Sequence, residues 1–339
     1  MTARLLLERG PILAFRRRVG ALDERLPSGP DSLRTAAWAG LQDSTPRAAL
    51  LSIHARVAGT DPFAWEDSSL VQLWGPRFSA YVVAAVDLAV FSLGRLPEDG
   101  PRLRRAQETA DRLDVFLAGR RMPFGQAGRA MGVSPNMLRY GAPTGRVLIR
   151  WDGARQPTVW TVPPPAVAPH EARLELARRY LHVLGPGTPA AFAEWGGVRP
   201  PRARTVFDAL APELVPVRTP IGDAWILVAD EPALREPPAP AATARLLPSG
   251  DAFYLLQGSD RDLLVPDAAH RGELWTPRVW PGALLVGGEV VGTWRRAQES
   301  VTLQPWRRLS RAERDAVVEE AASLPLPGPR GPIAVTWKD

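Results

Sequence analysis

Hydrophobic residues recur at helical spacing in two runs within residues 35–57, and a polar break at residues 42–46 (QDSTP) separates them. Ser44 or Thr45 suits the cap of the second helix, and Pro46 suits its first turn. We therefore expect the polar break at a helix entrance, where free backbone N–H groups form a polar pocket. Ordinary helix capping is the alternative interpretation, because the same residue types mark most helix starts.

Apolar spacing also divides the chain into units built in one order. Three helices followed by a strand or a hairpin are predicted within residues 1–95, 101–163 and 168–230, and a β-rich part within residues 244–325. This order is typical of winged helices, in which a helix-turn-helix precedes a β-hairpin. The sequence thus predicts an α+β protein made of tandem winged-helix (helix-turn-helix) units with a β-rich C-terminal part.

Within these units the pattern places individual elements. The first unit is predicted to have a helix over residues 4–26, a strand over residues 78–83 and a helix from Val86 onward. The second unit ends in a hairpin with its turn at residues 152–153 (DG). In the third unit, Thr188 is expected to cap a short helix.

After the third unit the pattern changes. Residues 231–243 are rich in proline and alanine and are predicted to be a surface loop. Residues 244–306 are predicted to be strands, with a tight hairpin turn at residues 287–288 (GG). A final helix is expected over residues 310–323, and the tail over residues 326–339 is expected to be loosely held.

Apolar stretches are too short to cross a membrane. An apolar run over residues 80–86 ends at Asp87, whereas a membrane helix needs about 20 apolar residues. The N-terminal stretch carries Glu8 and Arg9 and lacks a small-residue cleavage site, which favours a helix over a signal peptide. We expect a cytoplasmic, nucleoid-associated protein that is a monomer and has no membrane partner.

The chain has no cysteine, which excludes disulfides, thiolate zinc sites and cysteine nucleophiles. Motifs of P-loops, zinc proteases and serine hydrolases of the GxSxG type are absent from the sequence. The four histidines are His54, His170, His182 and His270, and no two of them have the spacing of metal ligands. We therefore expect no metal and no cofactor.

Positive charge comes almost wholly from arginine. Of 42 basic residues only Lys338 is a lysine, and the formal net charge is +6. Arginine presents a planar fork that suits phosphate groups, so the balance is consistent with a polyanionic partner such as double-stranded DNA. Codon bias in a GC-rich genome is the alternative explanation for the arginine content.

Four segments resemble, in order, the AlkZ/YcaQ-type winged-helix DNA glycosylases. They are GLQDSTPRAALLSIHARV (40–57), RRYLHVLGPGTPAAFAEWGGV (178–198), RLLPSGDAFYLLQGSDRDLL (245–264) and LLVGGEVVGTWRR (284–296). The resemblance implies a hydrolase that cleaves the N-glycosidic bond of N7-alkylated or bulky purine adducts, in DNA repair or self-resistance to genotoxins. A lyase-type glycosylase needs an amine, and the chain offers only Lys338 and its N-terminus, so a monofunctional, water-using enzyme is expected.

In that family a Gln-x-Gln or Gln-x-Asp pair positions water and stabilises the sugar cation. Gln42 matches the first position, Ser44 occupies the second, and Asp43 is a carboxylate one residue early. We take Gln42 with Asp43 or Ser44 as the candidate catalytic group. Ser44 thus departs from the family pattern, and Tyr81 is a second departure, because the family often has histidine at that position.

The helix-turn-helix ends and wings are the expected DNA contacts, since these elements bind phosphates and groove edges. In the second and third units they carry Asn136, Arg139, Arg146, Arg150, Arg155, Arg199, Arg202 and Arg204. The hairpin at residues 287–288, followed by Arg295 and Arg296, is expected to enter a minor groove. A solvated arginine face is the alternative for each residue.

Asp251 and Arg261 match family positions and are interpreted as a structural ion pair. The rival function is a non-catalytic winged-helix DNA-binding protein that has lost the second catalytic side chain, and a protein-interaction scaffold is a third alternative. An open cleft at Gln42 rimmed by arginines favours chemistry, whereas a filled pocket there favours the rival.

Overall fold

The computed structural model describes residues 4–98, 100–153, 155–237, 240–297, 299–326 and 333–338. Within them, helices accompany three β-sheets, so the predicted α+β class is confirmed. The part that carries the polar break consists of β1 (Leu5–Leu6), α1 (Arg9–Val19), α2 (Pro30–Ala36), β2 (Leu41–Gln42), α3 (Ala48–Arg56), η1 (Ala64–Glu66), β3 (Leu70–Trp74), η2 (Pro76–Phe78), β4 (Ala80–Ala84), η3 (Ala85–Asp87), α4 (Leu88–Ser92) and η4 (Leu93–Arg95).

Two further stretches repeat the order of helices followed by a hairpin. The first comprises α5 (Gly100–Leu117), β5 (Met122–Pro123), α6 (Phe124–Ala130), η5 (Pro135–Thr144), β6 (Val147–Arg150) and β7 (Thr158–Thr161). The second comprises α7 (Pro169–Leu184), α8 (Pro189–Gly196), α9 (Pro200–Ala209), η6 (Ala211–Glu213), β8 (Leu214–Thr219), β9 (Gly222–Leu227), η7 (Val228–Asp230) and α10 (Glu231–Arg235). Thr188 caps α8 by accepting a hydrogen bond from the Ala191 amide, as the sequence predicts.

The C-terminal part is built on a five-stranded sheet. It contains β10 (Ala244–Leu247), η8 (Ala252–Tyr254), α11 (Asp260–Leu264), α12 (Ala268–Leu274), β11 (Gly282–Val286), β12 (Glu289–Ala297), β13 (Ser300–Pro305), α13 (Arg311–Ala322) and β14 (Ala334–Trp337). The predicted turn at residues 287–288 joins β11 to β12, with both glycines at positive φ. Ser310 and Glu313 form a capping box at the start of α13.

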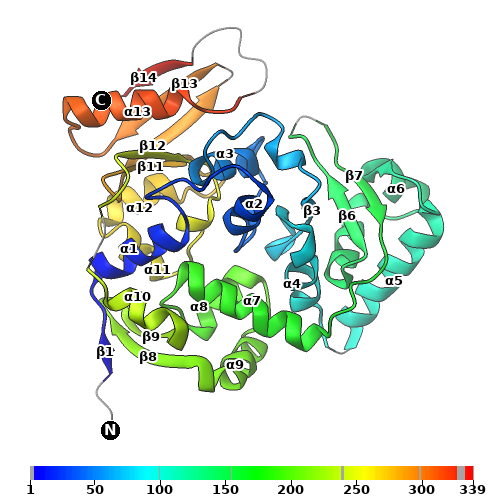
Figure 1. Ribbon diagram of the computed structural model, residues 1–339. Helices are drawn as coiled ribbons and strands as arrows, with labels where there is room; N and C mark the ends of the chain where they lie inside the picture. Colours follow the sequence, from blue (N-terminus) through cyan, green and yellow to red (C-terminus); the bar gives the residue numbers. More distant parts are fainter. Residues whose placement is uncertain are drawn as a thin grey trace.

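Figure 1 shows how these parts surround the polar break. Helices α2 and α3 lie near the middle, the C-terminal sheet lies above and to the left, α5 and α6 lie to the right, and α7 to α9 lie below. Helix α7 connects the parts, since it packs against α4 and η4 on one side and against β9 on another. Its Tyr180 contacts Phe192 and Trp195 of α8, with ring centroids 5.5 and 5.4 Å apart.

The sheets cross the boundaries between the predicted units. Strands β2, β4 and β3 continue through β6 into β7 and β5, so residues of the first two predicted units share one six-stranded sheet. The join is the antiparallel pairing of Gln72 with Ile149. Strand β1 likewise pairs with β8 and completes the third sheet. The predicted boundaries are therefore divisions of the sequence that the sheet topology does not follow.

Several local predictions are wrong. The helix expected over residues 4–26 is shorter, and the strand Leu70–Trp74 was not predicted. Residues 244–306 are not all strand, because α11 and α12 lie among them, and the Asp267 side chain caps α12.

Two segments expected to be loose also form elements. Helix α10 opens the stretch predicted to be a surface loop over residues 231–243. In the tail, Ala334–Trp337 pairs with β13 in parallel, and Arg314 lies over the Trp337 ring at 4.8 Å, whereas residues 327–332 and 339 lie outside the described residues.

Candidate active site

Gln42 ends the edge strand β2 and lies opposite Tyr81 of β4. Its Oε1 accepts hydrogen bonds from Arg77 Nη2 at 3.0 Å and from the Tyr81 hydroxyl at 3.3 Å. Because a guanidinium only donates, the atom that faces Arg77 must be the amide oxygen. Nε2 has no hydrogen-bond partner in the described part of the chain, so Gln42 has a fixed carbonyl and a free amide donor.

The loop at residues 248–251 closes against this amide. Gly250 has φ +77°, and a Cβ there would lie 2.9 Å from Gln42 Nε2. Glycine is required twice over, since L side chains rarely adopt this conformation and a methyl group would press on Nε2. The sequence reading missed Gly250, although the LLPSGD stretch was one of those that resemble the glycosylase family.

A buried ion pair holds the loop against α3. Arg56 donates to both carboxylate oxygens of Asp251 at 2.7 and 2.8 Å, and the Ser52 hydroxyl donates to one of them at 2.7 Å. Burial raises the pKa of Asp251, but the Arg56 charge and these hydrogen bonds outweigh it and leave the pKa below its ordinary value. The pair joins α3 to the residue after Gly250, and so fixes the loop beside Gln42.

The expected Asp251–Arg261 ion pair is therefore wrong. Arg261 Nε donates to the Leu256 carbonyl at 3.0 Å, and the guanidinium lies over the rings of Trp275 and Trp280. Arg56 takes Asp251 because α3 brings it directly to the loop, whereas Arg261 lies on α11. Sequence spacing carried no information about which arginine would arrive.

Asp43 faces the opposite way from Gln42. It is 4% exposed, its Oδ1 accepts the Ala49 amide at 3.0 Å, and its Oδ2 accepts Gln72 Nε2 at 2.6 Å. Burial, the largest influence, raises the pKa of Asp43 to about 6 although these donors and the Arg47 charge lower it. Asp43 is thus a buried cap that ties the entrance of α3 to β3.

This arrangement corrects the predicted capping. Ser44 is exposed, no side chain caps α3 at its N-cap residue Arg47, and the helix begins at Ala48, two residues after Pro46. The Asp43 carboxylate reaches the Ala49 amide instead, and a charged acceptor binds a helix entrance more strongly than a hydroxyl.

A cavity of about 250 Å³, here called the motif cleft, opens beside these residues. Its walls come from the entrance of α3, from the loop at 248–251 and from the C-terminal sheet: Thr45, Pro46, Ala48, Leu51, Pro248, Ser249, Val279, Trp280, Pro281, Gly282, Trp294, Arg295 and Arg296. The predicted Arg295 and Arg296 thus line a cleft with apolar walls, two indole rings and two positive charges. Gln42 is not among the lining residues, but Ser249 of this wall precedes Gly250, which lies against the Gln42 amide.

More positive charge gathers around Trp65, near the cleft. Arg150 lies over the Trp65 ring at 4.1 Å and Arg47 at 5.3 Å. Burial, and secondarily the Arg47 charge, lowers the pKa of Arg296, which places Arg47 close to it. Arg150 pairs with Glu66 at 2.9 Å, whereas neither Arg47 nor Arg296 has an ion pair with any described residue. Anionic ligands therefore meet unneutralised arginine here.

The other predicted DNA contacts are not equally placed. Arg199 and Arg204 are exposed on or beside α9, and Asn136 is exposed on η5. Arg202 is paired with Glu98 at 3.0 Å. The Arg139 guanidinium is half-buried, and its Nε has no hydrogen-bond partner within the described ranges.

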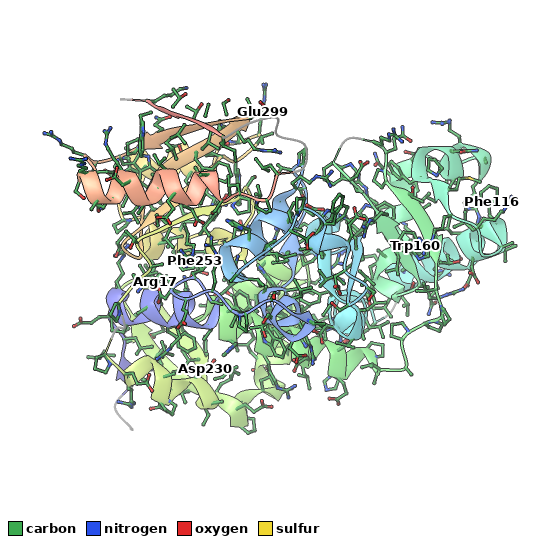
Figure 2. All side chains as sticks on the ribbon, turned by 45° about the horizontal axis from the view of Figure 1, so that its top comes forward. Arg17, Phe116, Trp160, Asp230, Phe253 and Glu299 are labelled. Carbon is green, nitrogen blue, oxygen red and sulfur yellow. The ribbon has the colours of Figure 1, made fainter. Side chains whose placement is uncertain are left out.

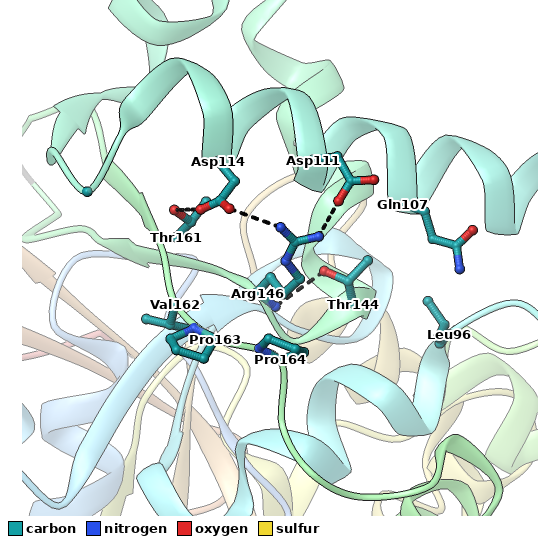
Figure 3. A pocket seen from close by; sticks show the side chains of 11 residues that line it. Leu96, Gln107, Asp111, Asp114, Thr144, Arg146, Thr161, Val162, Pro163 and Pro164 are labelled. Atoms are coloured by element: carbon teal, nitrogen blue, oxygen red, sulfur yellow. Dashed lines mark hydrogen bonds and ion pairs between the residues drawn. The ribbon is translucent and has the colours of Figure 1, made fainter.

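Arg146 faces carboxylates. It lines a cavity of about 750 Å³ beside α5, where Figure 3 shows Asp111 and Asp114 directed at its guanidinium. It pairs with Asp111 and, at 3.1 Å, with Asp114. The hydrogen bond that Arg146 donates to Asp111 is the largest cause that raises the pKa of Arg146. Two negative charges oppose one positive charge here, which disfavours a DNA phosphate.

The hairpin turn at residues 287–288 is held by α1. Arg17, labelled in Figure 2, donates Nη1 to the Gly288 carbonyl at 3.2 Å, and Arg9 pairs with Glu289. This turn lies at the other end of β12 from Arg295 and Arg296, so the length of the strand separates the turn from the two arginines. The arginine end borders the motif cleft, and the glycine end packs on the protein.

The described residues contain no cluster of three or more histidine or carboxylate side chains that could hold a metal ion. No helix in the ranges described combines the length and apolar character that crossing a bilayer requires.

The fold is similar to that of a known DNA glycosylase. The structure matches that of a Streptomyces sahachiroi DNA glycosylase, AlkZ, with a TM-score of 0.77 and 19% sequence identity, over 98% of this chain and 100% of that one. The family model described as "DNA glycosylase AlkZ-like" matches residues 35–325, and the chain belongs to that family. The resemblance found in the sequence is thereby confirmed.

A curated relative is similar over a shorter stretch. It is an "Interstrand DNA cross-link repair glycosylase" of Streptomyces sahachiroi, 29% identical over 161 residues. The matched stretch is 46% of this chain and 43% of the relative, so it spans less than half of either protein.

Proposed function

We propose that this chain is a monofunctional DNA glycosylase that hydrolyses the N-glycosidic bond of N7-alkylated or bulky purine adducts in double-stranded DNA, in repair or self-resistance. The observation that carries the proposal is the state of Gln42: two donors fix its carbonyl, and its free amide lies against Gly250, the residue after Ser249 of the arginine-lined motif cleft. An amide whose carbonyl is fixed and whose N–H groups are free can hold a water or a substrate atom in one position.

The reaction needs little acid catalysis. An N7-alkylated purine is already cationic, so the electrons of the C1′–N9 bond leave with the base, which departs neutral. An oxocarbenium-like sugar remains, and water adds its oxygen to C1′ and releases one proton to solvent. Gln42 holds that water by donating from Nε2, and positioning it is the main contribution an amide can make.

Ser44 and Asp43 take different parts in this proposal. Ser44 is exposed two residues after Gln42 and in this proposal supplies a second contact to the water. Asp43 is a positioning residue, because its carboxylate is occupied by Ala49 and Gln72. Ionised above its pKa of about 6, it also places negative charge beneath the site, which favours a cationic sugar.

We propose that each of the three repeats of helices and hairpin is a winged helix and that DNA crosses the arginine-rich side of the motif cleft. The contacts we assign are the unpaired Arg47, Arg295 and Arg296, together with Arg150 from the second repeat. Arg199, Arg204 and Asn136 extend this set. Arg146 is left out because Asp111 and Asp114 neutralise it.

A base-release assay tests the proposal. The substrate is duplex DNA with 7-methylguanine or a bulky N7 adduct, and released base is measured in single turnover. Gln42→Ala should lower the rate by roughly 100-fold or more, as removal of a preorganised donor does elsewhere. Ser44→Ala should lose less, and Ser44→Gln, which restores the family pair, should raise activity on simple N7-alkyl lesions.

Gln107→Ala, an exposed glutamine on α5, is the matched control and should keep the wild-type rate. The rival function is a non-catalytic DNA-binding protein, favoured by serine at the second position and by Tyr81. Tight DNA binding by wild type without release of any N7 adduct would establish the rival.

A further inference from the structure

A second cavity, of about 350 Å³, lies where η2 and η4 meet α5 and η5. Here it is called the arginine cavity, because four guanidinium groups and two aromatic rings line it: Arg77, Arg95, Arg102, Arg105, Phe78 and Tyr140. Across the described parts of the chain, no carboxylate lies within ion-pair distance of any of these four arginines. Four like charges around one small space repel one another, and an anion between them removes that repulsion.

Arg95 forms the buried wall of the cavity. It is 8% exposed, and its Nη1 donates to the Trp74 and Phe91 carbonyls at 3.0 and 3.3 Å. Its Nε is buried and has no partner among the described residues. A buried N–H without an acceptor is uncommon in folded proteins and indicates a missing ligand atom or water. Nη2 likewise has no hydrogen-bond partner among the described residues, and because it is not fully enclosed it is the nitrogen of Arg95 that an anion in the cavity can reach.

The aromatic rings hold the arginines and do not form a slot for a base. Arg105 lies over Tyr140 at 4.9 Å, Arg95 over Phe78 at 5.6 Å, and the two rings meet edge to face at 5.3 Å. A guanidinium thus lies over a face of each ring. The wall offers fixed positive donors, which suit a tetrahedral anion better than a planar base.

Arg77 joins the arginine cavity to the candidate active site. Its Nη2 donates to Gln42 Oε1, and its Nη1 donates to the Trp195 carbonyl at 2.8 Å. Arg77 and Phe78 both have positive φ, 55° and 57°, a conformation that non-glycine residues adopt only where the surroundings impose it. The backbone is therefore bent to place one arginine between the cavity and Gln42.

We propose that the arginine cavity is a phosphate-binding site, separate from the motif cleft, that takes a single phosphate group. A phosphodiester of the DNA backbone and a free phosphate share this chemistry. In either case the group receives donors from Arg102 and Arg105 at the rim and from Arg95 at the wall. A DNA phosphate bound here fixes the strand beside Gln42.

The test uses the whole protein and needs no glycosylase activity. Arg102→Gln/Arg105→Gln removes the two exposed rim charges, and Arg104→Gln is the matched control, an exposed arginine of the same helix that does not line the cavity. The probes are inorganic phosphate, by calorimetry, and an unmodified DNA duplex, by affinity over a series of salt concentrations. Arg102→Lys/Arg105→Lys retains the charges and reports on loss of fold.

If DNA supplies the phosphate, the slope of log K against log salt should fall by about 1 in the glutamine double variant. Arg104→Gln should leave the slope unchanged, and the lysine variant should restore it. If free phosphate is the ligand, wild type and Arg104→Gln should bind one inorganic phosphate and the glutamine variant none. The proposal is overturned if phosphate binding and the salt slope of DNA binding are the same in the glutamine variant, the wild type and Arg104→Gln. If the wild type releases no base while these binding results hold, the phosphate-binding site stands and only the proposed glycosylase function is contradicted.

Discussion

Replacement of Asp43 by asparagine should change how the free energy of unfolding depends on pH. Burial raises the pKa of Asp43 from 3.8 to about 6, so the folded protein holds this proton to higher pH than the unfolded chain does. Between these values the native state binds more protons, and stability therefore falls as pH rises. A rise from 3.8 to about 6 corresponds to about 3 kcal/mol lost across that window.

Chemical denaturation of wild type and Asp43→Asn, from about pH 4 to about pH 7, measures the effect. Asparagine does not titrate, and its changed hydrogen bonds to Ala49 and Gln72 add an offset that pH leaves constant. The wild type should lose about 2–3 kcal/mol relative to the variant over this range. Parallel curves for the two proteins would show that Asp43 is ionised throughout the range and would refute the reasoning from burial.

Asp260 provides the control for activity. Burial is also the main cause that raises its pKa to about 6, but it lies on α11 beside Arg16. Asp260→Asn should therefore alter the stability profile in the same sense as Asp43→Asn. The pH profile of base release should lose its acid limb near pH 6 in Asp43→Asn and keep it in Asp260→Asn. If both variants alter the pH profile of base release equally, the change comes from lost stability and not from the charge of Asp43 beneath Gln42.

Three further changes test the supporting geometry. Gly250→Ala should lower the free energy of unfolding by roughly 1–2 kcal/mol, because alanine disfavours the left-handed backbone at this position. It should also lower base release at least tenfold, because the methyl group displaces the Gln42 amide. A wild-type rate in single turnover would contradict this. Arg56→Met should cost about 3–5 kcal/mol in urea denaturation, because Asp251 stays buried without its partner, and a loss below 1 kcal/mol would place the pair outside the core. Arg296→Gln should reduce the salt slope of DNA binding by about 1, and an unreduced slope would move DNA away from the motif cleft.

The sequence alone was enough to predict the features that depend on residues close together in the chain. Apolar periodicity and turn residues were enough to predict the α+β class, the repeated order of helices and hairpins, the Thr188 cap and the helix after Ser310. Four matching segments were enough to assign the family. Local spacing also located the polar break at residues 42–46, and the family resemblance then selected Gln42 within it as a candidate. Each of these features involves residues a few positions apart.

Only the tertiary structure decided which partners meet. The carboxylate that caps α3 is Asp43 and not a nearer hydroxyl, since the helix starts later than Pro46 suggests. Arg56, and not Arg261, reaches Asp251 across 195 positions of sequence. Arginines that look alike in the sequence differ as well. The guanidinium of Arg146 is neutralised by Asp111, whereas those lining the arginine cavity have no carboxylate partner among the described residues. Charge and hydrogen-bond pairing depends on distances that chain folding sets, and a local pattern of residue types does not contain those distances.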